Sequence, residues 1–123
     1  MDPDLPARRG RGLSERLCRL DDLADPGSAA FVIRWLGLRQ SLMVIRRGDR
    51  VFGYLNNCPH IGAPLDGQSG RFLDLTGCYI QCGMHGALFE PETGRCIGGP
   101  CAGKSLSPVP LSLDDGAIFV TVP

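Results

Sequence analysis

Two short stretches of the sequence each pair a cysteine with a histidine. NNCPHIGAPLD holds Cys58 and His60 at a C-x-H spacing, and CGMHGALFE holds Cys82 and His85 at a C-x2-H spacing. They contain the only two histidines of the chain, and both are rich in glycine or proline, which are typical of turns and loops. Thiolates and imidazoles are good ligands for transition metals. The two pairs therefore indicate a metal site built by two loops.

Other sites that use these residue types need different spacings. Structural zinc sites commonly combine C-x2-4-C with H-x3-5-H or with a second cysteine pair, and neither layout is present. A plant-type cluster needs C-x4-C-x2-C; Cys96 and Cys101 have the first spacing, but no C-x2-C follows. A Cys–His nucleophilic pair has no use for a duplicated mixed pair. A two-iron cluster can use both pairs. The alternative is that the four residues bind one zinc ion, which would make the protein a structural or interaction module.

With these residues the sequence resembles the Rieske family. Its signature is Cys-x-His followed by Cys-x2-His, with two histidines replacing two cysteines on one iron of a [2Fe–2S] cluster. The neighbouring residues agree, with CPH and GAPL in the first loop, HGALFE and ETG after the second pair, and GGP further on. The resemblance implies that Cys58 and Cys82 bind one iron and that His60 and His85 bind the other.

The resemblance also implies which residues surround the cluster. In the high-potential members a disulfide joins the loops, and a serine and a tyrosine hydroxyl donate hydrogen bonds to sulfur. Here Ala63 and Met84 replace the cysteines, and Ala87 and Phe89 replace the hydroxyl residues. Because hydrogen bonds to sulfur stabilise the reduced state, we expect a potential in the lower Rieske range, about −150 mV toward zero. The other expected shell residues are Pro59, Ile61, Leu65, Leu88, Gly99 and Pro100.

The rest of the sequence predicts an all-β protein. Seventeen glycines and ten prolines in 123 residues favour short strands joined by tight turns. Apolar and β-branched runs predict strands near 16–20, 31–38, 41–47, 78–82, 86–90 and 95–97, and hairpin turns at Gly48–Asp49 and Asp115–Gly116. With the resemblance, this implies the Rieske iron–sulfur fold, a small antiparallel β-sandwich with a cluster-binding subdomain of two loops.

One domain accounts for this length. We assign residues 1–15 to a flexible N-terminal arm and residues 16–123 to the Rieske domain; the resemblance covers about 17–123. The 21 residues between His60 and Cys82 are more than the family usually has there.

Four cysteines lie outside the motif. Without a secretory signal, a disulfide framework is not expected. Cys18 and Cys78 fall on apolar strand stretches and are predicted to be buried, reduced thiols. Cys96 and Cys101 bracket IGGP and are predicted to be packed thiols, with a reversible disulfide or a second metal site as the alternative.

The charges limit the classes of partner. Thirteen basic and thirteen acidic residues balance, and no basic stripe is present, so we expect no nucleic-acid binding. Residues 51–123 hold three basic and six acidic residues, so this half favours a partner with a basic docking face. No apolar run is long enough to cross a bilayer, and no hydrophobic segment follows Arg8 and Arg9, so a cytoplasmic protein is expected.

The resemblance to the ferredoxins of ring-hydroxylating dioxygenase systems implies an electron carrier instead of an enzyme, because the chain leaves no room for a mononuclear-iron catalytic domain. We expect a monomer that passes single electrons from an NAD(P)H-dependent flavin reductase to a terminal oxygenase, with His60 and His85 at the contact surface. A small Rieske subunit of a larger reductase, such as nitrite reductase, is the alternative within the family.

Overall fold

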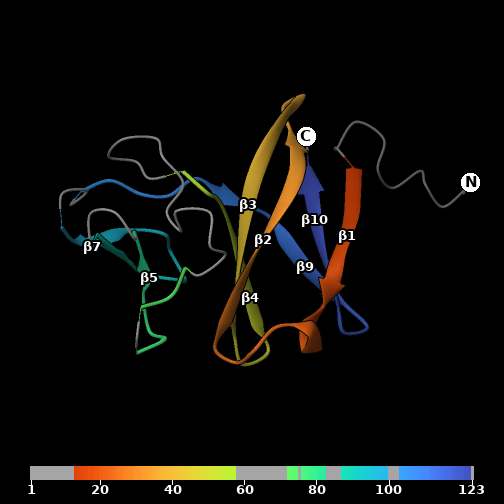
Figure 1. Ribbon diagram of the computed structural model, residues 1–123. Coiled ribbons are helices and arrows are strands. Elements are labelled where there is room, and N and C mark those ends of the chain that lie inside the picture. The colour runs from red at the N-terminus through yellow and green to blue at the C-terminus, as the bar shows by residue number, and fades with distance from the viewer. Residues whose placement is uncertain (1–12, 58–71, 75, 83–86, 100–102, 123) are drawn as a thin grey trace, which may run out of the picture.

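The computed structural model describes residues 13–57, 72–74, 76–82, 87–99 and 103–122. Figure 1 shows that these residues form strands almost throughout, which confirms the all-β prediction. The elements are β1 (Leu13–Arg19), the 3-10 turn η2 (Leu20–Asp22), β2 (Gly27–Trp35), β3 (Leu38–Arg47), β4 (Arg50–Leu55), β5 (Ile80–Gln81), β6 (Leu88–Phe89), β7 (Cys96–Gly98), β8 (Pro108–Val109), β9 (Leu111–Asp114) and β10 (Ala117–Val122).

The strands form three sheets, in the orders β1-β10-β9, β2-β3-β4-β8 and β5-β6-β7. Every pairing of named strands within them is antiparallel. In Figure 1 the four-stranded sheet lies in the middle, with β1, β9 and β10 on one side and the small sheet of β5 and β7 on the other. The protein is therefore an antiparallel sandwich that carries a smaller sheet on its outer face.

Strand β3 supplies side chains to two separate cores. Its residues 42–45 are 0% exposed, because the strand is covered on both faces and successive side chains point to opposite faces. The sandwich core comprises Leu23, Ile33, Leu42, Val44, Val109, Ile118, Val120 and Val122. The subdomain core comprises Met43, Ile45, Tyr54, Phe72, Ile80, Cys82, Ala87, Phe89, Cys96 and Leu106.

The hairpin turns predicted at Gly48–Asp49 and at Asp115–Gly116 are confirmed. Asp115 and Gly116 have φ values of 52° and 78°, the left-handed pair that matches the twist of two adjoining strands. A third hairpin joins β2 to β3 at Leu36–Gly37 with nearly the same values, 53° and 80°.

Some strand boundaries differ from the predicted ones. β1 starts at Leu13, so residues 13–15, predicted to belong to the N-terminal arm, instead pair with β10. The strands predicted at 78–82 and 86–90 shrink to β5 and β6, of two residues each. No helix in the described part of the chain has the length and apolar character needed to cross a membrane.

Candidate metal centre

The structure describes one of the four predicted ligands, Cys82. Cys58, His60 and His85 lie outside the described residues. The same holds for the predicted shell residues Pro59, Ile61, Ala63, Leu65, Met84 and Pro100. The geometry of the centre is therefore seen at Cys82, at the shell residues Ala87, Leu88, Phe89 and Gly99, and at the residues that anchor both loops.

Cys82 follows β5 directly and is 1% exposed. Its N–H donates a hydrogen bond to the carbonyl of Ala87 at 2.9 Å, which joins the two ends of the segment that contains His85. One residue earlier, the N–H of Gln81 donates to the carbonyl of Phe72 at 2.7 Å. These two backbone bonds fix the position of Cys82 at the edge of the small sheet.

The first ligand loop is anchored by Asn56, which is 7% exposed and lies two residues before Cys58. Its N–H donates to the carbonyl of Ser41 on β3 at 2.8 Å, and its side-chain Nδ2 donates to the Ser41 hydroxyl at 3.1 Å. A buried amide needs such partners. Sequence reasoning missed this anchor, although a polar residue directly after the apolar strand β4 was a usable signal.

The surroundings of Cys82 are apolar. Ala87 and Phe89 are 0% exposed and belong to the subdomain core together with Cys82. Phe89 pairs with Ile80 on β5 and with Cys96 on β7. Burial alone disfavours a free thiolate, whereas metal binding removes the proton, so a buried thiol at this point fits a cysteine ligand of an iron–sulfur cluster.

Gly99 brings the predicted cluster cover against the second loop. It has a φ of +90°, and a Cβ at this position would lie 2.8 Å from the Cα of Ala87. The backbone at Gly99 can approach Ala87 this closely only because residue 99 has no side chain. Gly99 and Ala87, both predicted to be shell residues, are thus brought together.

Tyr54 connects the small sheet to β4. Its hydroxyl donates to the carbonyl of Pro91 at 2.6 Å, and its ring packs on Gly94, where a Cβ would lie 2.6 Å from the ring Cε1. Burial raises the pKa of Tyr54 to about 12, and the negative charge of Glu92 acts in the same direction. Tyr54 therefore holds the turn between β6 and β7 on β4, together with Arg50, whose guanidinium donates a hydrogen bond to Glu92 in the same turn.

The cysteines outside the motif divide into three cases. The prediction of a buried Cys78 is wrong: Cys78 is exposed, because it lies in a polar turn where its N–H donates to the Thr76 hydroxyl. Cys18 is half-buried beside an irregularity in the β1–β10 register, and burial raises its thiol pKa. Cys96 is a buried thiol that donates to the carbonyl of Gly98, as predicted, while Cys101 lies outside the described residues.

Two ferredoxins of known structure are similar to this chain. The ferredoxin of carbazole 1,9a-dioxygenase from Nocardioides aromaticivorans IC177 is 26% identical with a TM-score of 0.70, over 89% of this chain and 98% of that chain. The Sphingomonas yanoikuyae B1 ferredoxin is 25% identical with a TM-score of 0.67, over 90% of this chain and 100% of that chain.

A larger protein shares the fold alone. The terminal oxygenase of carbazole 1,9a-dioxygenase from Nocardioides aromaticivorans IC177 is 18% identical with a TM-score of 0.71, over 92% of this chain but 31% of that chain. No curated protein matches the sequence.

The family match agrees with the fold and with the ligand spacing. The model of the Rieske [2Fe-2S] domain matches residues 16–114, which is most of the chain. Among the described residues, the buried Cys82 directly after β5 and the close approach of Gly99 to Ala87 are compatible with the predicted cluster ligand and shell. The chain therefore belongs to the Rieske [2Fe–2S] family, and its cofactor is a Rieske-type [2Fe–2S] cluster.

Proposed function

We propose that this Rieske protein is a one-electron carrier that receives electrons from an NAD(P)H-dependent flavin reductase and delivers them to a terminal oxygenase. The observation that carries the proposal is the likeness to two ferredoxins over 98% and 100% of their lengths. By contrast, the chain covers 31% of the terminal oxygenase that shares its fold. The match is therefore to the carrier and to one part of the oxygenase.

In this proposal Cys58 and Cys82 hold one iron, and His60 and His85 hold the other, which faces the partner. The bound cluster supplies the one-electron chemistry. The chain contributes a fixed frame, because Asn56 anchors the segment before the first pair and the Cys82–Ala87 backbone bond closes the segment around the second. A rigid frame of this kind lowers the energy needed to rearrange the protein when the cluster gains or loses an electron.

The apolar surroundings determine the potential. Ala87 and Phe89 have no hydroxyl group, and both are fully buried beside Cys82 in the subdomain core. With no hydroxyl donor at these two positions, the extra negative charge of the reduced state is less stabilised. We expect a midpoint of about −150 mV to zero, and a titration that gave a value above roughly +200 mV would contradict this assignment.

The first test is an EPR spectrum after dithionite reduction, with Cys82→Ser as the control for ligand loss. Mixed histidine and cysteine ligation lowers the average g-value, so a Rieske signal is expected in the wild type and its loss in the variant. A colourless, zinc-rich protein would instead support the zinc-bound module.

The second test is electron transfer to a purified acceptor. The reduced protein is mixed without oxygen with the terminal oxygenase of carbazole 1,9a-dioxygenase from Nocardioides aromaticivorans IC177, and reoxidation is followed by stopped flow. Second-order reoxidation is the result expected of a mobile carrier. A protein that co-purifies only as a fixed part of a larger reductase would support the subunit alternative.

A further inference from the structure

The end of the β2–β3 hairpin exposes apolar side chains to solvent. Val32, Leu36 and Leu38 are 59%, 70% and 63% exposed, which makes them the most exposed large hydrophobic residues that the structure describes. Figure 1 shows this hairpin projecting beyond the strands on either side of it. Single exposed apolar residues are ordinary, but three lie at this one hairpin end. Val32 pairs with Ser41 on one face, Leu38 pairs with Trp35 on the other face, and Leu36 lies in the turn between the strands. The hairpin end is therefore apolar on both faces, as is typical of an interaction site.

The turn at this end contains a residue that its backbone disfavours. Leu36 has a φ of 53°, a left-handed conformation that strains residues with a large side chain. The turn between β9 and β10 has the same geometry but places Asp115 at the equivalent position, and Asp is among the residues that this turn prefers. The fold itself does not need a leucine at position 36. Strain of this kind is common where a residue serves a function.

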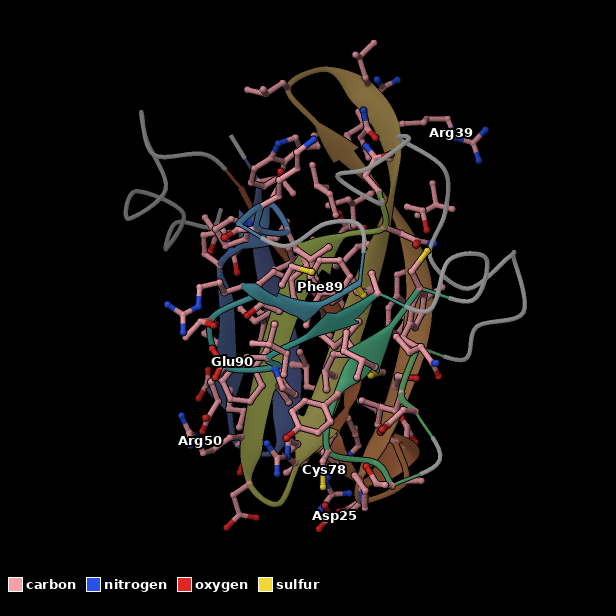
Figure 2. The ribbon with its side chains drawn as sticks, turned by 90° about the vertical axis from the view of Figure 1, so that its left-hand side faces the viewer. Asp25, Arg39, Arg50, Cys78, Phe89 and Glu90 are labelled. Carbon is pink, nitrogen blue, oxygen red and sulfur yellow. The ribbon has the colours of Figure 1, made fainter. Side chains whose placement is uncertain are left out.

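The hairpin is also positively charged. Between residues 26 and 48 the chain has four arginines and no aspartate or glutamate. Two of them, Arg34 and Arg39, pair with each other across the hairpin on the face that also carries Val32, and Figure 2 shows Arg39 standing out from the hairpin. They also line a groove of about 580 Å³, to which Glu15 contributes the one acidic side chain among its lining residues. The surface is therefore complementary to an apolar patch bordered by carboxylates.

The hairpin lies at the end of the sheet from which the first ligand loop departs. β4 ends where Leu55 pairs with Leu42, and Asn56 bonds to Ser41, two residues before Cys58 in the sequence. β3 extends from Ser41 back to Leu38, which at about 3.3 Å per residue is roughly 10 Å of additional strand. The hairpin tip therefore extends roughly 10 Å past the end of β4, after which the chain continues to Cys58 and His60.

We propose that the hairpin tip, defined as Val32, Arg34, Leu36, Leu38 and Arg39, is a docking surface for the redox partner. The partner face that fits it has an apolar patch bordered by carboxylates. This inference rests on the electron-carrier function proposed above and adds a second contact to the one at the cluster ligands. Docking covers the exposed leucines and valine and places the two arginines opposite acidic side chains.

The decisive variant is Leu36→Asn, because fold and docking respond to it in opposite directions. Asparagine suits the left-handed turn position, so the unfolding midpoint rises, while the apolar contact is lost. The second-order rate constant for reoxidation by the carbazole 1,9a-dioxygenase oxygenase named above is expected to fall about tenfold, with the EPR spectrum and the midpoint potential unchanged. Leu113→Asn, at an exposed leucine of β9, is the matched control and leaves the rate constant unchanged.

Charge reversal tests the electrostatic part. The double variant Arg34→Glu and Arg39→Glu is expected to lower the same rate constant at low ionic strength and to remove its decrease with added salt. The control is Arg95→Glu, at an exposed arginine between β6 and β7.

The outcomes separate the two proposals. Rate constants unchanged by the tip variants would overturn the docking surface and leave the carrier function standing. A Rieske signal without any transfer from the wild type to this oxygenase would count against both. A dimer in sedimentation that Leu36→Asn dissociates would show that a second copy covers the tip, which also overturns the redox-partner assignment.

Discussion

The two faces of the four-stranded sheet are covered in different ways. On the sandwich side, β10 contributes six residues and pairs in long registers with β1 and β9. On the other side, β5 and β6 have two residues each and β7 has three. Both faces nevertheless bury side chains of the same run of β3, residues 42–45.

The small sheet therefore depends on particular contacts more than on strand pairing. The hydroxyl of Tyr54 holds the carbonyl of Pro91, and the N–H of Leu106 donates to the carbonyl of Gly94 at 2.8 Å. Each of these contacts joins segments that are distant in the sequence. The sandwich is thus held by many repeated backbone hydrogen bonds. The cluster side is instead positioned by a few side chains and glycines, and no neighbouring contact compensates when one of them is substituted.

The largest expected effect comes from removing one large core side chain on each face. Phe72→Ala and Ile118→Ala both empty fully buried positions and should destabilise the fold by about 3–5 and 2–5 kcal/mol respectively, as measured by urea unfolding. Only Phe72→Ala should also reduce the iron bound per chain under native conditions, because the Phe72 side chain packs in the same core as Cys82, whereas Ile118 belongs to the sandwich core. Equal iron loss in the two variants would contradict the division into two cores.

Two glycine substitutions compare a packed position with an open one. Gly94 and Gly48 have φ values of +74° and +63°, so alanine strains the backbone at both, by roughly 1–2 kcal/mol. At Gly94 the new Cβ also meets the ring of Tyr54 at 2.6 Å, whereas at Gly48 it meets no atom within 4 Å among the described residues beyond its two chain neighbours. Urea unfolding should show Gly94→Ala to be the more harmful by about 1–3 kcal/mol. Equal losses would mean that Tyr54 moves freely.

The scaffold was more predictable from the sequence than the cluster side was. The apolar run of β3 and the Gly–Asp and Asp–Gly turns are local signals, and they gave correct strands and hairpins. The ligand spacing likewise led to the family, which the Rieske match to residues 16–114 confirms. These features are carried by residues that are close together in the chain.

The missed features depend on contacts that no local pattern records. CYIQC has the composition of a strand, yet Thr76 and Asp74 bond the backbone of Cys78 and Tyr79 into a turn, so the strand starts at Ile80. The Asn56–Ser41 anchor and the packing of Tyr54 on Gly94 likewise join residues 15 and 40 positions apart.

Tyr54 provides a pH-dependent measure of the link between the two faces. Its pKa is raised from 10.0 to about 12 in the folded protein, chiefly by burial. The neutral phenol therefore stabilises the folded state fully below pH 10, and this contribution is lost as the pH rises from 10 to 12. Tyr54→Phe should lower the free energy of unfolding by about 1–2 kcal/mol at neutral pH, because it leaves the Pro91 carbonyl without its donor. The variant should also lack the decrease in the free energy of unfolding that Tyr54 causes between pH 10 and 12.

Tyrosinate absorbance during an alkaline titration provides the control. The wild type should show a tyrosinate step near pH 12 from Tyr54, and the variant should lack this step. Ionisation of Tyr54 near pH 10 in the wild type would mean that Tyr54 is not held in its buried position.

The smallest effect on stability concerns the cysteines of the small sheet. Cys78 is exposed in the turn before β5, whereas Cys96 is 6% exposed on β7 and its thiol donates to the carbonyl of Gly98. Iodoacetamide should therefore label Cys78 in the native protein with little change in the unfolding midpoint, and should label Cys96 only after denaturation, as mass spectrometry of the digested protein can show. Cys78→Ser is the control that removes the native label. Labelling of Cys96 in the native protein at the rate of Cys78 would show that the small sheet opens while the sandwich stays folded. The two faces of the four-stranded sheet would then differ in local stability as well as in the contacts that hold them.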